Sequence, residues 1–191
     1  LTEKKQGEYT VEDYRKFPED ERVELIDGTI YDLAAPLSVH QLLASKIYSA
    51  LAGYIEQNKG ACIPMFAPVD VQLDQDDKTM VQPDLMIVCD RKKLTRQGVF
   101  GAPDFIVEIL SESTRKKDSY LKLMKYQKAG VREYWLVDPD KKKVIVYDLE
   151  RAEIPVIYGF TDQVPVRIFD GKCEIDFSRI YENIKFIYEQ S

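Results

Sequence analysis

Hydrophobic and polar positions along the chain follow two different periods, which predicts a mixture of helices and strands. Between residues 38 and 57 the apolar residues recur at spacings of three and four, the pattern of a helix with one buried face. The stripe of this helix is His40, Leu43, Ile47, Leu51 and Tyr54. Residues 23–26 and 29–33 flank Asp27-Gly28, a dipeptide typical of the two-residue turn of a β-hairpin.

The remaining apolar segments complete the set of predicted elements. We expect strands at residues 69–73, 81–88, 105–110, 132–137 and 143–149, with shorter strands around Val156 and Val166. We expect helices at residues 10–17, at residues 113–129 before Gly130, and from about residue 178. The segment 105–110 is almost continuously apolar, which indicates a central strand. This order predicts an α/β fold, a mixed β-sheet flanked by α-helices with additional β-hairpins.

Length and cysteine content limit the class of protein. The 191 residues contain no linker or repeat, so we expect a single domain over residues 1–191. No segment approaches the roughly 20 apolar residues of a membrane span, and none resembles a signal peptide. Cys62, Cys89 and Cys173 form no Cys-x-x-Cys pair, so we expect neither a disulfide framework nor a structural zinc site. These features predict a cytoplasmic protein with no membrane partner.

Charge is distributed unevenly along the chain. The formal net charge of −6 argues against a protein that coats nucleic acid non-specifically. Residues 112–132 nevertheless hold seven basic and two acidic residues, so this segment carries +5 and the rest of the chain −11. One interpretation is a solvated helix face. The other is a surface that binds the nucleic-acid backbone, with Arg115, Lys116, Lys117 and Lys125 as its candidates.

Two acidic residues occupy positions where a charge is costly. Glu108 interrupts the apolar segment 105–110, and Asp84 stands at the start of the apolar segment 83–88. No phosphate-binding glycine-rich motif and no nucleophilic-serine motif occurs, and His40 is the only histidine. Two carboxylates on neighbouring strands can form an oxygen site suited to Mg²⁺ or Mn²⁺. Alternatively, they are acids at strand ends that bind nearby backbone or a lysine.

These acids belong to a longer, ordered set of motifs. Residues 83–84 and 108–110 resemble the PD-(D/E)XK motif of the restriction-endonuclease-like nucleases. A larger set of blocks resembles the Uma2 (Uma-two) family of that superfamily: VELIDG at 23–28, QPDL at 82–85, VEILS at 107–111, STR at 113–115, then Asp118, Lys122, Tyr126, and AGVREYWLVDP at 129–139. The blocks cover about residues 10 to 150. The resemblance implies a restriction-endonuclease-like core with a metal site at the edge of its central strands.

The chain departs from this pattern at the motif lysine, where it has Leu110, and in the following loop, where position 112 is glutamate instead of proline. The next helix offers a replacement, since three of its residues lie four apart on one side: Asp118, Lys122 and Tyr126. We expect the stem of Lys122 to turn inward and its ammonium to reach Glu108. The family pattern also has a lysine at this helical position.

The sequence therefore predicts a Mg²⁺- or Mn²⁺-dependent endonuclease acting on DNA in preference to RNA. By the resemblance, Asp84, Glu108 and the backbone carbonyl of Ile109 would hold the metal, with Glu24 and Lys122 completing the catalytic set. The substitution Lys122→Ala is expected to remove cleavage and leave folding intact.

Two further residues are candidates for supporting this site, namely His40 and Gln82. The alternative for His40 is that it is a core histidine held by a hydrogen bond.

A second class of function stays open at this point: a catalytically inactive protein with the nuclease fold that binds nucleic acid or a protein partner. The acidic net charge and Leu110 both favour it. For the enzyme we expect a homodimer, because enzymes that cut both strands of a duplex often pair their sites across a two-fold axis.

Overall fold

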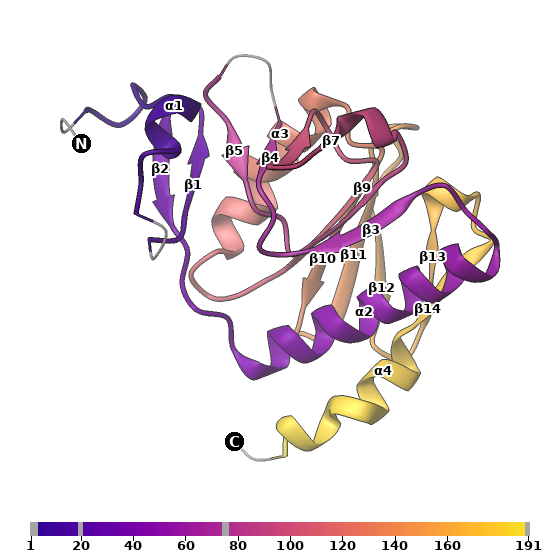
Figure 1. Ribbon diagram of the computed structural model, residues 1–191. Helices are drawn as coiled ribbons and strands as arrows, with labels where there is room; N and C mark the ends of the chain where they lie inside the picture. The colour runs from indigo at the N-terminus through magenta and orange to yellow at the C-terminus, as the bar shows by residue number, and fades with distance from the viewer. Residues whose placement is uncertain (1–3, 19–20, 74–76, 190–191) are drawn as a thin grey trace.

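The computed structural model describes residues 4–18, 21–73 and 77–189, and within these ranges the strands form two six-stranded mixed sheets and one hairpin (Figure 1). In spatial order the first sheet consists of β2 (Thr29–Asp32), β1 (Val23–Ile26), β5 (Met80–Val81), β4 (Val71–Gln72), β8 (Gly98–Phe100) and β7 (Leu94–Thr95). The second consists of β12 (Val156–Gly159), β11 (Lys143–Asp148), β10 (Glu133–Asp138), β9 (Phe105–Ile109), β6 (Leu85–Val88) and β3 (Ile63–Phe66). The hairpin pairs β13 (Gln163–Val166) with β14 (Cys173–Asp176).

The helices lie around the second sheet and beside the N-terminal hairpin. The α-helices are α1 (Val11–Tyr14), α2 (Ser38–Gln57), α3 (Leu123–Ala129) and α4 (Phe177–Ile184). Shorter helical segments are η1 (Arg91–Lys93), η2 (Lys117–Lys122), η3 (Arg167–Phe169) and η4 (Lys185–Ile187). Mixed sheets with flanking helices and extra hairpins confirm the predicted α/β class.

Strand β9 is the centre of the second sheet, as its apolar sequence predicts. It pairs in parallel with β10 and antiparallel with β6, and all five of its residues are buried. Its two faces enter different cores. Phe105 and Val107 pack with residues of α2 and α4, whereas Ile106 packs with Tyr126 of α3 and with Val81 of the first sheet. Alternating side chains of β9 therefore tie both helical layers to one strand.

The segment predicted as one strand at residues 81–88 is divided between the two sheets. β5 belongs to the first sheet and β6 to the second, and the residues between them are Gln82, Pro83 and Asp84. Proline has no N–H to donate to a ladder, so a strand breaks readily there. The break puts Asp84 at the crossover between the sheets, where its backbone carbonyl accepts the Ala67 N–H at 3.0 Å.

The helix predicted at residues 113–129 begins two residues later and winds unevenly. Reciprocal bonds between Ser111 and Thr114 precede its first helical residue, Arg115. The segment η2 is a π-helix, whose hydrogen bonds span five residues, and α3 continues it to the left-handed Gly130. This wider winding is absent from the sequence-based expectation and changes which side chains share a face.

Other local differences are small in extent. The structure adds strands β3, β7, β8 and β14, and shortens the strand expected at residues 69–73 to two residues. The helix expected at residues 38–57 forms as α2 with the same bounds. The Asp27-Gly28 hairpin is confirmed, with φ values of 50° and 73° at the turn. No helix in the described ranges is long and apolar enough to cross a bilayer.

The expectation of no disulfide is wrong for this structure. Cys62 and Cys89 are bonded to each other, and Cys173 is free and buried. The two bonded cysteines continue the antiparallel register of β3 and β6, in which Ile63 lies opposite Val88. Strand pairing brings together residues 27 positions apart, which spacing alone does not reveal. The predicted cytoplasmic location therefore loses the support it drew from unpaired cysteines.

Candidate active site

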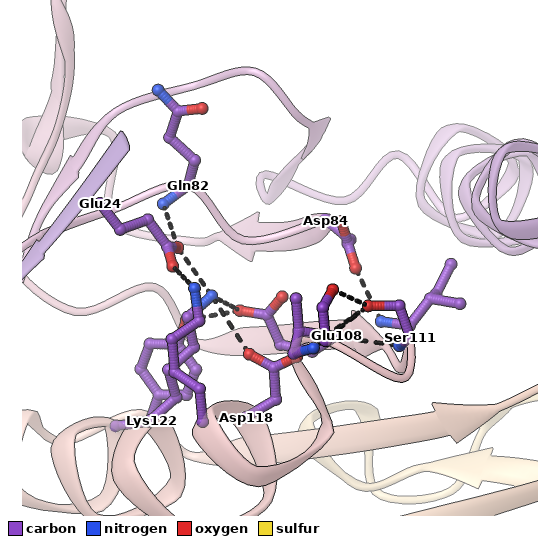
Figure 2. Close-up of polar contacts among 12 residues, drawn as sticks. Glu24, Gln82, Asp84, Glu108, Ser111, Asp118 and Lys122 are labelled. Carbon is purple, nitrogen blue, oxygen red and sulfur yellow. Dashed lines mark hydrogen bonds and ion pairs between the residues drawn. The ribbon is translucent and has the colours of Figure 1, made fainter. Parts of the chain in front are cut away.

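Three buried or half-buried carboxylates come together from three different places in the chain (Figure 2). Asp84 lies in the crossover between β5 and β6, Glu108 in β9 and Glu24 in β1. In the antiparallel pair β6–β9, Leu85 is opposite Val107, and the same register continued by one residue sets Asp84 opposite Glu108. Glu24 enters from the first sheet, so the site lies where the two sheets meet.

The ammonium of Lys122 joins two of these acids. It lies 2.7 Å from Oε1 of Glu24 and 2.9 Å from Oε1 of Glu108, and 3.5 Å from Oδ1 of Asp118 (Figure 2). Lys122 is 2% exposed, Glu24 0% and Glu108 3%. The contact expected between Lys122 and Glu108 is therefore present, and it includes Glu24 as well. The catalytic role of Lys122 stays a prediction.

Glu24 accepts three donors, which explains why a carboxylate can be fully buried on a hairpin strand. Its Oε1 accepts the main-chain N–H of Gln82 at 3.0 Å in addition to Lys122, and its Oε2 accepts Lys117 at 2.7 Å. Lys117 also lies over the ring of Tyr31, 5.6 Å from its centroid. Sequence reasoning placed Glu24 near the site but did not connect it with Lys117.

Asp84 is held by a different set of donors. Its Oδ2 accepts the main-chain N–H of Ile109 at 2.7 Å and contacts Nε2 of His40 at 3.0 Å. Both candidate support residues thus lie nearby, but they act differently. His40 bonds Asp84 through its ring, whereas the side-chain amide of Gln82 turns away and donates to Tyr14 and Asp70. Gln82 supports the cluster through its backbone alone.

Tyr126 belongs to the site, although the sequence placed it only on the helix side of Asp118 and Lys122 and gave it no chemical role. Its hydroxyl donates to Oε1 of Glu108 at 2.7 Å, on the same oxygen that Lys122 contacts. Its ring is fully buried and packs against Tyr134 at 5.0 Å between centroids. The available signal was its position four residues after Lys122, which sets the two side chains on one helix side.

Burial and ion pairing act in opposite directions on the acids. Burial raises the pKa of Glu108 to about 8, although the ammonium of Lys122 favours its charged form. For Glu24 burial is outweighed by Lys122 and Lys117, and the pKa of Glu24 lies below its usual value. Burial is likewise outweighed at Lys122, where Glu108 and Glu24 hold the pKa well above its usual value. The cluster therefore keeps Lys122 cationic and Glu24 anionic at neutral pH.

The basic residues expected to bind a nucleic-acid backbone do not form one exposed face. Arg115 pairs with Asp138 and Asp140, and Lys117 is turned toward Glu24. Lys125 is 5% exposed and lies 2.5 Å from Asp27. Lys116 is exposed. Local acids therefore pair with three of the four predicted contacts. The acids of the N-terminal hairpin pair with Lys117 and Lys125, and those at the turn after β10 pair with Arg115.

The acids open onto a cavity of about 890 Å³. Asp84, Glu108, Lys117 and Lys122 line it together with Ile109, and the first turn of α2 forms another part of its wall. Leu110, which replaces the motif lysine, is buried at its edge. The cavity is large enough for a small organic or nucleotide ligand.

The oxygen atoms of Asp84 and Glu108 are ligands of the kind that Mg²⁺ prefers. Within the described ranges no three His, Cys, Asp or Glu side chains are arranged to hold a metal. Asp84 and Glu108 supply two carboxylates at the cavity, and no contact in those ranges engages Oδ1 of Asp84 or Oε2 of Glu108. Mg²⁺ is commonly bound through one or two carboxylates plus waters and substrate phosphates. Asp84 and Glu108 therefore fit Mg²⁺ by their chemistry.

Comparison with known proteins identifies the family. A family model, Uma2, described as "Putative restriction endonuclease", matches residues 11–177. The chain belongs to the Uma2 family. The fold of this Uma2 protein is also similar to a solved structure from Anabaena variabilis, titled as a putative nuclease belonging to DUF820. The TM-score is 0.75 at 21% sequence identity, over 91% of this chain and 97% of that chain. No curated protein matches the chain.

The family match covers all the acids of the site, from Glu24 through Glu108, and both lysines that contact them. It confirms the family that the motifs resemble, and the similar solved structure confirms the fold. The Uma2 motifs at residues 23–28, 82–85 and 107–111 are therefore the segments that carry Glu24, Asp84 and Glu108 to one place.

Proposed function

We propose that this Uma2 protein is a Mg²⁺- or Mn²⁺-dependent endonuclease that hydrolyses phosphodiester bonds, with DNA as its substrate in preference to RNA. One observation carries the proposal: Asp84 and Glu108 line a cavity of about 890 Å³, and Lys122 lies beside Glu108 although the motif position itself holds Leu110. Lys122 brings the missing positive charge to Glu108 from a helix instead of from the strand.

The metal would be held by Asp84, Glu108 and the backbone carbonyl of Ile109. When bound, such an ion lowers the pKa of a coordinated water and polarises the scissile phosphate. The contacts of the chain support this assignment. The N–H of Ile109 bonds Asp84, so the end of β9 and the crossover before β6 are fixed relative to each other.

The other residues of the site orient these ligands. His40 contacts Oδ2 of Asp84, which leaves Oδ1 for a ligand in the cavity. Lys122 and Tyr126 both bond Oε1 of Glu108, which leaves Oε2. Fixing one oxygen of each carboxylate determines where the other points. Glu24 holds Lys122 in place through its own three donors.

Nicking of supercoiled plasmid in Mg²⁺ or Mn²⁺ tests the proposal. We expect the wild type to nick and the variants Asp84→Asn and Glu108→Gln to lose at least about 100-fold in rate. Glu174→Gln is the matched control, because Glu174 is an exposed strand glutamate outside the site. Calorimetric titration with Mn²⁺ adds a binding measurement, in which the two site variants lose the heat that the wild type shows.

Two results would reject the enzyme. One is a wild type that cleaves neither plasmid nor single-stranded DNA nor RNA while binding no Mn²⁺ at millimolar concentration. The other is cleavage that Glu108→Gln retains in full, since a contaminating nuclease would then be its source. The first result favours the inactive nuclease-fold protein.

A further inference from the structure

Two lysines, not one, contact the carboxylate of Glu24. Lys122 lies 2.7 Å from Oε1 and Lys117 lies 2.7 Å from Oε2, so each oxygen has its own ammonium. The two lysines are the first and last residues of the π-helical segment η2. In a regular α-helix, residues five apart point about 140° away from each other. The hydrogen bonds of a π-helix span five residues, which turns both side chains toward Glu24.

The two ammonium groups have different surroundings. Lys122 is enclosed by the carboxylates of Glu24, Glu108 and Asp118, and its side chain is 3% exposed. The side chain of Lys117 is 11% exposed, and within the described ranges its single acidic partner is Glu24. Both residues line the cavity that contains Asp84 and Glu108.

An ammonium has three N–H donors, and their use separates the two lysines. Lys122 lies at hydrogen-bond distance from the carboxylates of Glu24 and Glu108, and Oδ1 of Asp118 at 3.5 Å is a buried acceptor with no hydrogen bond of its own among the described residues. Turning this ammonium toward a phosphate would weaken its contacts with buried carboxylates. Lys117 gives one donor to Glu24 and keeps two for a ligand in the cavity. The ring of Tyr31 at 5.6 Å adds a face that tolerates the cation without consuming a donor.

We infer that Lys117 is the catalytic lysine that contacts the scissile phosphate, and that Lys122 is a positioning residue for Glu24 and Glu108. The inference rests on the proposed nuclease function. In the reaction a water oxygen bonds to phosphorus and loses a proton to solvent, while the phosphorus bond to the leaving oxygen breaks and that oxygen takes up a proton. Lys117 donates hydrogen bonds to the non-bridging oxygens as negative charge develops there, and it is not consumed.

Plasmid nicking by Lys117→Met tests the inference against Lys128→Met, which removes the same charge from an exposed position on the adjoining helix α3. We expect Lys117→Met to lower kcat by about 10²- to 10³-fold with KM within about threefold, the size of loss seen when one transition-state donor is removed. Lys128→Met should keep the wild-type kcat. Lys117→Arg should recover part of the rate, because it restores the charge.

Folding and metal binding are measured on the same variants. Lys117→Met should bind Mn²⁺ as the wild type does, since Lys117 contacts neither Asp84 nor Glu108. Lys117→Gln is the second variant should Lys117→Met fold poorly, because its amide can still donate to Glu24. Retention of wild-type kcat by folded Lys117→Met or Lys117→Gln overturns the inference. A proportional rise in KM with unchanged kcat also overturns it, because Lys117 would then bind the ground state alone.

The proposed function can fail separately from this inference. A wild type that never cleaves and binds no Mn²⁺ removes the nuclease and the role of Lys117 together. A wild type that cleaves, with Glu108→Gln inactive and Lys117→Met fully active, leaves the nuclease intact and refutes only the division of roles between the two lysines.

Discussion

The substitution Lys122→Met probes the ion pairs among Lys122, Glu24 and Glu108 most directly, because it keeps the stem of the side chain and removes its charge. In the folded protein it would leave Glu24 and Glu108, 0% and 3% exposed, without their shared cation. Removing one partner of a buried ion pair costs about 3–5 kcal/mol. Lys117 still pairs with Glu24, and Tyr126 still donates to Glu108, so we expect a loss at the lower end, about 3 kcal/mol.

Urea denaturation at pH 7.5 measures this loss, with Lys128→Met as the control for removing an exposed lysine from the same helical segment. A loss of about 3 kcal/mol corresponds to a fall in Tm of roughly 6–12 °C for a chain of this length. The control should stay within about 0.5 kcal/mol of the wild type. The same measurement tests the expectation drawn from sequence that folding survives in a Lys122 variant.

The pH dependence supplies an independent check. Because Lys122 and Lys117 lower the pKa of Glu24 in the folded protein, the ion pairs of Glu24 stabilise the fold above its unfolded pKa of about 4.5. That contribution is lost as the pH falls through the folded pKa. The difference between wild type and Lys122→Met should therefore be largest near neutral pH and shrink below about pH 4.5. A variant within 1 kcal/mol of the wild type at pH 7.5, or a difference independent of pH, would refute the reasoning.

Two further predictions concern stability away from the cluster. Gly28 has φ +73°, and a Cβ there would lie 2.4 Å from the carbonyl oxygen of Gly7, so Gly28→Ala should cost at least about 2 kcal/mol in thermal or urea unfolding. Gly53→Ala, in α2 with no atom within 4 Å, should gain about 1 kcal/mol, and equal effects of the two would contradict the turn geometry. Burial raises the pKa of Glu133 from 4.5 to about 7, so its ionisation opposes folding and stability falls by up to about 3 kcal/mol between pH 4.5 and 7. Glu133→Gln should remove that part of the slope in denaturation at pH 5 and 8, and an unchanged slope would show that the group titrates normally.

Local sequence signals predicted much of the fold because they act over a few residues. The Asp27-Gly28 turn, the apolar stripe of α2 and the continuous apolar strand β9 each form where their pattern predicts. The failures involve pairing between distant segments. The strands β3, β7 and β8 have short or irregular hydrophobic patterns. They form strands because they can pair with neighbouring strands through backbone hydrogen bonds.

The same distinction applies to the acids of the site. Glu108 and Asp84 were recognisable because a charge in an apolar strand needs a partner, and the motif spacing then related them to each other. The register that sets Asp84 opposite Glu108 could not be derived from either segment alone. Glu24 reaches the cluster only because the first sheet meets the second there, which is a property of the assembled fold.

The lysines show most clearly where sequence reasoning stops. A helical wheel of 3.6 residues per turn selects Lys122, with Asp118 and Tyr126 on the same side, and the structure does bring these three side chains to one region. The same wheel turns Lys117 away, and it becomes a candidate for phosphate contact at the surface. The π-helical winding of residues 117–122 returns it to Glu24, at the cavity wall. A π-helical segment is wound more widely than an α-helix, and such segments are often found at functional sites. Its position here, bounded by the two lysines of one carboxylate, is therefore the structural reason to look for separate roles for Lys117 and Lys122.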